Sequence, residues 1–233
     1  MQIVLQTYPV LLMGALLTLE ITLLSVALGC ILGLIAGLAR LSKNRIASIT
    51  ARCYIDFIRG TPLLVQILII YYGIPQILLQ VQDFLVVSYG IAKIADNFNL
   101  PVMLAAVLAC GINSGAYIAE IFRAGVQSIE RGQTEAARSL GMTQGQAMRY
   151  IILPQAFKRV IPPLGNEFIA MLKDTSLLSV IGIQELTRRG QLIIADTFAA
   201  FAILMAVAFL YLIMTLSFSR FVDYLERRFK TSD

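Results

Sequence analysis

The sequence predicts an all-α membrane protein with about five transmembrane helices. Of its 233 residues, 58% are hydrophobic and only 14% are charged, and the mean hydropathy is +0.78. Soluble domains usually carry about 25% charged residues. The charged residues gather in short segments and leave long apolar stretches between them. Because a charge in hydrocarbon is costly, this distribution indicates several membrane spans in one transmembrane domain covering residues 1–233.

Five apolar segments are long enough to cross a bilayer, since a span needs about 20 residues at a rise of 1.5 Å each. They cover about residues 9–38, 54–79, 100–122, 160–183 and 197–218. The first is too long for a cleaved signal peptide and has no basic region before it, so we expect it to be retained. Pro62 and Pro75 lie inside the second segment and should kink it.

The positions of Lys and Arg predict the orientation. These residues cluster after the first span, between the third and fourth spans, and in the C-terminal tail. With five spans, all three clusters fall on one side of the membrane, and the positive-inside rule makes that side cytoplasmic. The N-terminus is then outside and the C-terminus cytoplasmic, in a bacterial inner membrane. The net charge of +5 is thereby explained without nucleic-acid binding, because the basic residues flank apolar runs.

Composition argues against a metal or cofactor site in this chain. The sequence has no histidine, and its three cysteines form no CxxC pair. Cys30 and Cys110 lie within apolar runs and are interpreted as small apolar side chains. The sequence also lacks a G-x-x-x-x-G-K-[ST] loop, so any ATP must be bound by a separate subunit. We therefore expect no cofactor here.

The cytoplasmic connection, about residues 123–159, has the pattern of two short helices. Residues 135–140 favour a helix, and Gly141 is a natural left-handed stop. Thr143 and Gln146 have the spacing of a capping box, which predicts a second helix. We expect that helix to end before Pro154. The pattern alone leaves two interpretations open: an ordinary amphipathic helix pair, or a knob that a partner protein binds.

The residues of this connection resemble the EAA loop of ABC importer permeases. Every fixed position of that loop is matched, by Glu135, Ala136, Ala137, Gly141, Ile151, Leu153 and Pro154. Three further segments resemble the branch of that family that transports polar amino acids such as histidine, arginine, glutamine and glutamate. They are residues 57–66, 113–117 and 172–178. The resemblance extends over nearly the whole chain.

The resemblance implies a type I ABC importer permease fold in which this EAA loop forms coupling helices that dock on an ATPase. It implies that Glu135 is the acidic contact, that Ala136 and Ala137 allow close approach, and that Gly141 is the bend between the helices. The implied partners are two ATP-binding cassette ATPase subunits, a second permease subunit (identical or homologous) and an extracytoplasmic amino acid binding protein. The chain is then a transport subunit and not an enzyme.

Polar residues near the middle of the spans are the candidates for substrate binding. Counting 1.5 Å per residue from the cytoplasmic side places Gln66, Asn113, Asn166 and Glu167 at about 14–15 Å depth. Transporters commonly bind substrate at that level. Tyr117 follows Asn113 by four residues and therefore shares its helix face. Hydrogen bonding between helices is the alternative role for the amides.

A carboxylate at this depth needs a partner, because burying it alone costs about 2.5 kcal/mol or more. For Glu167, that partner is either a cationic substrate, such as arginine, lysine or histidine, or the side chain of Lys173. Lys173 and Asp174 lie in the outer half of the fourth span. They are predicted to form a gate or a pair between two subunits or, equally well, a structural ion pair.

The sequence therefore predicts the membrane permease subunit of an ATP-driven importer of polar, and preferentially basic, amino acids. The first alternative is an ion-coupled secondary transporter, which would show an even number of spans and internal repeats. The second is an integral-membrane enzyme, which would need a catalytic cluster that the sequence does not contain. Besides the protein partners named above, the chain is expected to contact membrane lipid.

Overall fold

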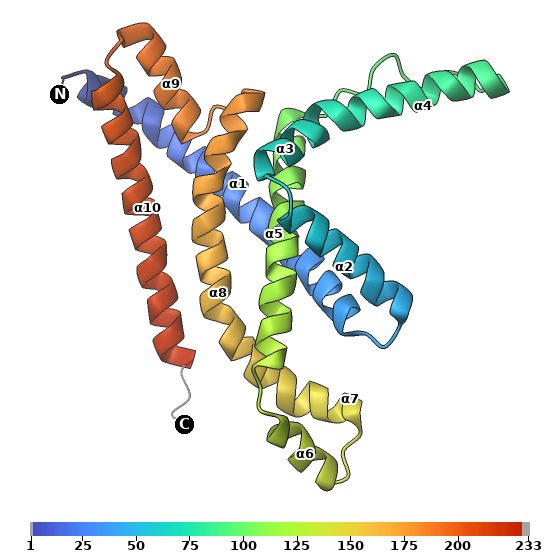
Figure 1. The fold of residues 1–233 in the computed structure, drawn as a ribbon. Helices are drawn as coiled ribbons and strands as arrows, with labels where there is room; N and C mark the ends of the chain where they lie inside the picture. The colour runs from blue at the N-terminus through green and yellow to red at the C-terminus, as the bar shows by residue number, and fades with distance from the viewer. Residues whose placement is uncertain (1, 230–233) are drawn as a thin grey trace.

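A computed structural model describes residues 2–229, and within this range the secondary structure is entirely helical (Figure 1). Short π-helical turns connect α3 to α4 (Ile69–Gly73) and α7 to α8 (Met148–Ile152), and a 3₁₀ helix (Thr175–Ile181) follows α8. The helices are α1 (Gln2–Leu41), α2 (Arg45–Arg59), α3 (Leu63–Leu68), α4 (Ile74–Tyr89), α5 (Val102–Gln127), α6 (Arg131–Ser139), α7 (Gln144–Ala147), α8 (Leu153–Asp174), α9 (Leu186–Thr197) and α10 (Ala200–Phe229).

Four helical segments of the described chain are long and apolar enough to cross a membrane. They are Ile3–Leu41, Leu63–Tyr89, Val102–Gln127 and Ala200–Arg228, and they contain most of four predicted spans. The remaining predicted span, 160–183, lies in α8 and the 3₁₀ helix and is not one of these four; α8 carries five charged residues, Lys158, Arg159, Glu167, Lys173 and Asp174. Helix α8 nevertheless packs against both α5 and α10 and runs alongside them (Figure 1). The count of five spans therefore stays a prediction.

The second predicted span begins later than expected. Residues 54–59 belong to α2, a separate helix that ends at Gly60, and α3 begins only after Pro62. The expected distortion at the prolines is confirmed, since Pro62 caps α3 and Pro75 follows a π-helical turn. Proline lacks the N–H that a helix interior needs, so it is accommodated at a helix start.

The EAA loop has the two predicted helices, α6 and α7. The Thr143 hydroxyl accepts from the Gln146 N–H while the Gln146 side chain accepts from the Thr143 N–H, which confirms the capping box. Gly141 has φ of +82°, the left-handed geometry predicted for the bend. The prediction that the second helix ends before Pro154 was wrong. The helix continues through a π-helical turn into α8, with Pro154 in the first turn.

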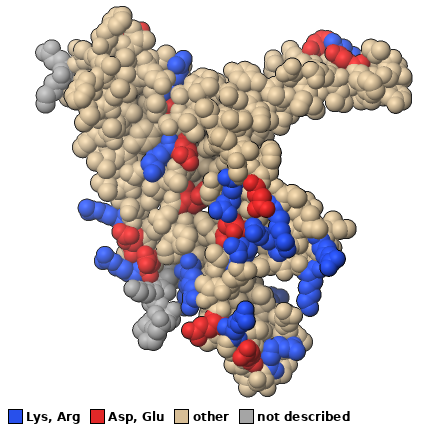
Figure 2. All heavy atoms as spheres, viewed as in Figure 1, with Lys and Arg blue, Asp and Glu red and all other residues tan. Residues whose placement is uncertain are grey.

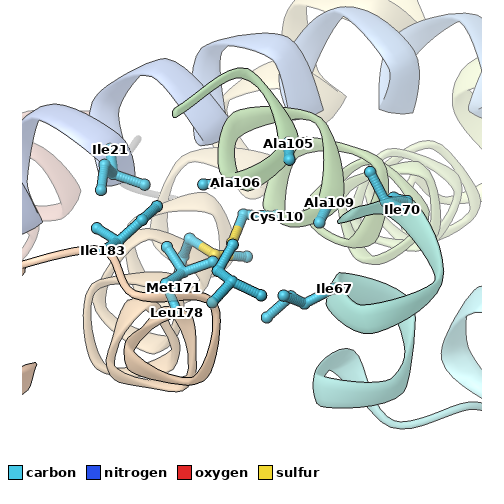
Figure 3. Close-up of a cluster of buried hydrophobic side chains, with 11 residues drawn as sticks. Ile21, Ile67, Ile70, Ala105, Ala106, Ala109, Cys110, Met171, Leu178 and Ile183 are labelled. Carbon is cyan, nitrogen blue, oxygen red and sulfur yellow. The ribbon is translucent and has the colours of Figure 1, made fainter. Parts of the chain in front are cut away.

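Helix α1 packs along α5, and the contact depends on residues without side chains. A Cβ atom at Gly33 would lie 2.7 Å from the Ile118 Cβ atom, which is too close for any larger residue. The adjoining core joins α1, α3, α5 and the 3₁₀ helix (Figure 3). Ile21, Ile67 and Cys110 point into this cluster from α1, α3 and α5. This core fixes the helices that carry the polar residues discussed next.

Candidate functional site

A cavity of about 530 Å³ lies between the C-terminal end of α2, the second half of α5, and α8. Two of the predicted substrate residues, Tyr117 and Glu167, line it. The polar part of its wall is formed by Arg59, Tyr117, Glu120, Arg123, Ser128, Arg159 and Glu167. A cavity with this lining can hold a small polar molecule with groups of both charges.

Glu167 presents a carboxylate to this cavity from α8. Its only hydrogen bond within residues 2–229 comes from the Ser114 hydroxyl of α5, at 2.8 Å, and it forms no ion pair with those residues. The side chain is partly buried. One hydroxyl leaves most of the acceptor capacity of a carboxylate unused. Glu167 is therefore available to a cationic group in the cavity.

Gln66 and Asn113 lie together but away from the cavity wall. Each is only 5% exposed, and the Asn113 amide donates to the Gln66 carbonyl oxygen at 2.9 Å. The Gln66 amide also donates to the Ile58 carbonyl oxygen at 2.8 Å and to Thr61. These bonds use up the Gln66 amide within the chain. The geometry favours the interhelical alternative over substrate contact for this pair.

An ion-pair network that the sequence analysis did not identify borders the cavity. The Glu120 carboxylate pairs with Arg40 of α1, with Arg123 at 2.9 Å and with Arg59 at 3.6 Å. The Arg59 guanidinium also lies 5.4 Å from the centre of the Tyr117 ring, within range of a cation–π interaction. The spacing of Glu120 and Arg123, three residues apart near the end of an apolar span, was the available sequence signal.

The other predicted residues on α8 are placed differently. Asn166 is exposed and does not line the cavity, and Lys173 is also exposed. Asp174 is partly buried. Among the described residues of this one chain, Lys173 forms an ion pair with neither Glu167 nor Asp174, and a pair with a second subunit stays a prediction. A gating role for Lys173 and Asp174 stays a prediction.

The EAA loop presents an acidic and an apolar side chain at the end of the molecule. Glu135 and Ala136 are exposed on α6, whereas Ala137 is buried against the chain itself. Leu140, which precedes the bend at Gly141, is 83% exposed. The sequence analysis did not single out this exposed leucine, which lies in the same loop as Glu135.

Residues 29–231 match the family described as binding-protein-dependent transport system inner membrane component. The chain belongs to this family. It is 45% identical to the glutamine transport system permease protein of Escherichia coli over 95% of this chain and 94% of that protein. It is 34% identical to the arginine transport system permease protein of Bacillus subtilis, over 97% and 94%. The resemblance to ABC importer permeases is thereby confirmed.

Solved structures of such permeases share the fold. A chain of an amino acid ABC transporter crystallised with histidines matches with a TM-score of 0.84 and 43% identity, over 96% of both chains. A chain of the MetNI methionine ABC transporter matches with a TM-score of 0.71 at 19% identity, which shows the fold alone. The type I importer permease fold is confirmed.

Family membership decides the broad functional class. The chain is an inner-membrane transport subunit and not an enzyme, and ATP hydrolysis lies in a partner subunit. Such a permease works with an ATPase and a binding protein and needs no cofactor of its own. The secondary transporter and the membrane enzyme are both excluded.

Proposed function

We propose that this permease carries polar amino acids through the cavity between α5 and α8, and that Glu167 selects for a cationic group. The observation that supports this most is the Glu167 carboxylate, which faces the cavity with one hydroxyl partner within the chain. The relatives named for glutamine and arginine transport, and the amino acid ABC transporter crystallised with histidines, support the amino acid class.

The charges of the cavity wall suit a zwitterion. Glu167 would accept hydrogen bonds from an ammonium or guanidinium group, and Arg59, 43% exposed and only loosely paired with Glu120, could bind a carboxylate. The attraction between unit charges about 4 Å apart is about 4 kcal/mol at an effective dielectric constant near 20, before desolvation. A basic side chain could use this attraction, whereas an acidic one would be repelled. We therefore expect arginine, lysine or histidine to be favoured.

The assembly follows from the open surface and the exposed loop. Because the cavity is open at the surface of this chain, we propose that a second permease subunit, identical or homologous, completes the pathway. Two ATPase subunits would bind the EAA loop through Glu135, with the bend at Gly141, and an extracytoplasmic binding protein would deliver the amino acid. Helix α6 is short and exposes Glu135 and Ala136, which supports a docking role.

The distribution of charge supports the proposed orientation. Lys and Arg side chains gather mainly over the half of the visible face that includes α6 and α7 (Figure 2). The positive-inside rule assigns that end to the cytoplasm. Helix α1 begins at the end of the molecule away from α6 and α7, so the N-terminus would be outside, whereas the end of α10 would be cytoplasmic (Figure 1).

Uptake of labelled amino acids into proteoliposomes that contain the permease, its ATPase and its binding protein tests the proposal. We expect ATP-dependent uptake of basic amino acids and a loss of that uptake of at least tenfold in Glu167→Gln. Uptake of glutamine or glutamate alone would contradict the selection for cations. Uptake without the ATPase would contradict the importer itself.

A further inference from the structure

Helix α2 carries two apolar faces, and only one of them packs against the protein. Ser48, Ala51, Ile55 and Ile58 are buried against the chain. On the opposite side, Ile46, Ile49, Cys53 and Phe57 recur at intervals of three and four residues and form a second stripe, which we call the outer stripe. Ile46 is 77% exposed and Phe57 is 62% exposed. An apolar stripe opposite the packing face indicates that something apolar covers it.

A row of basic residues runs beside the outer stripe. Arg45 and Arg52 are seven residues apart and therefore lie on one side of α2, and Lys43 immediately precedes the helix. All three are exposed, and within residues 2–229 none forms an ion pair, although Arg52 donates to the Ser48 hydroxyl at 3.2 Å and the exposed Asp56 lies one turn after it. Arg45 also lies in the first turn of the helix, where the helix dipole disfavours a positive charge. Its position calls for a negative partner outside the chain.

The placement of α2 suits the inner surface of the membrane. Helix α2 packs beside the C-terminal part of α1 and runs back along it from a short turn (Figure 1). That turn lies toward the end of the molecule that carries α6 and α7 and most of the visible basic side chains (Figures 1 and 2). If that end is cytoplasmic, as proposed above, α2 lies near the cytoplasmic surface of the membrane, where an apolar stripe can contact acyl chains and basic side chains can contact headgroups.

We propose that α2 is a binding site for anionic phospholipid of the cytoplasmic leaflet. Acyl chains would cover Ile46, Ile49 and Phe57, and the headgroup phosphate would bind Lys43, Arg45 and Arg52. A helix with an apolar stripe and an adjacent basic row is typical of contact with a negatively charged membrane surface. A second copy of this chain is a poorer occupant, because a symmetric contact through the same face would bring the two basic rows together.

The position of the outer stripe can be tested at Cys53, which is exposed and lies at its centre. A spin label is attached to Cys53 in the reconstituted complex after Cys30 and Cys110 are replaced by alanine. We expect the label to collide with oxygen, which concentrates in lipid, more often than with a water-soluble nickel chelate. Preferential collision with nickel would overturn the proposal by placing the stripe in water. Shielding from both reagents would overturn it by showing a protein cover.

The basic row is tested separately from the transport function. Retention of phosphatidylglycerol by the purified complex is measured by native mass spectrometry for the triple variant Lys43→Gln, Arg45→Gln and Arg52→Gln. We expect the affinity to fall by about fivefold per basic residue, since each contributes about that factor near an anionic surface. The control removes the same charge from α10, through Arg220→Gln, Arg227→Gln and Arg228→Gln. An equal loss in both variants would show only general charge attraction and would overturn the site on α2.

Discussion

The hydroxyl of Ser114 donates a hydrogen bond to the carboxylate of Glu167 at 2.8 Å and so joins α5 to α8 at the cavity wall. The residue before it, Asn113, donates to the side-chain carbonyl oxygen of Gln66 on α3. Two adjacent residues of α5 therefore connect it to two different neighbours. One connection is buried, and the other leaves a carboxylate facing the cavity.

The first prediction separates the charge of Glu167 from its orientation. Glu167→Gln removes the charge and should reduce uptake of basic amino acids at least tenfold. Ser114→Ala keeps the charge but removes one hydrogen bond, worth about 1.5–3 kcal/mol when the partner is charged. We expect Ser114→Ala to weaken apparent affinity with a smaller effect on maximal uptake. Asp223→Asn, a carboxylate-to-amide change on the exposed surface of α10, is the control. If Glu167→Gln transports as well as this control, Glu167 does not select the substrate.

The second prediction concerns the buried amide pair. Gln66→Ala and Asn113→Ala should each lower the free energy of unfolding in detergent by about 1 kcal/mol. The double variant should lose less than the sum of the two, because both changes remove the same bond; coupling in membrane proteins averages about 0.6 kcal/mol. Denaturation curves of the four proteins measure it. Strictly additive losses, together with a selective loss of substrate binding, would favour the substrate role instead.

The third prediction concerns coupling to the ATPase. Glu135→Lys reverses a charge in the EAA loop, and Leu140→Glu replaces an exposed apolar side chain there by a charged one. Both should abolish transport-linked ATP hydrolysis while the permease still inserts and assembles. Glu130→Lys makes the same charge change at the start of α6, where the side chain makes no capping bond, and serves as the matched control. ATPase activity is measured in the reconstituted complex with and without binding protein. Normal stimulation in a well-expressed Glu135→Lys variant would rule out this contact.

The fourth prediction compares how much two members of the Glu120 ion-pair network contribute to stability. Glu120→Gln removes the only carboxylate that pairs with Arg40, Arg59 and Arg123 among the described residues, and should cost about 1–3 kcal/mol of stability. Arg59→Gln should cost less, because Arg59 is 43% exposed and lies 3.6 Å from the carboxylate. Unfolding midpoints in detergent compare the two. A larger loss in Arg59→Gln would mean that Arg59 has another partner.

The fifth prediction tests the orientation. A cysteine at Leu140, in a variant without the native cysteines, should react with membrane-impermeant reagents only from the cytoplasmic side. A cysteine at Ser88, near the end of α4, should react from outside. Both positions are exposed, so burial does not limit the reaction. The opposite labelling pattern would overturn the proposed topology.

The sequence by itself determined those features that depend on neighbours along the chain. The apolar segments, the left-handed bend at Gly141 and the Thr143–Gln146 capping box were predictable, because each follows from side chains at most a few residues apart. The motif in the EAA loop was sufficient to indicate the family. The distortion of the helix near Pro62 and Pro75 was predictable as well, because proline cannot donate the backbone bond a helix needs.

Only the tertiary structure decided which polar groups are used inside the protein and which face the cavity. Gln66 and Asn113 are 47 positions apart, and Ser114 and Glu167 are 53 positions apart, so their bonds depend on how α3 and α8 pack on α5. Depth along a helix can be counted from the sequence, but direction around the bundle depends on its neighbours. The way each helix is turned toward its neighbours placed one polar pair in the core and left the Glu167 carboxylate facing the cavity.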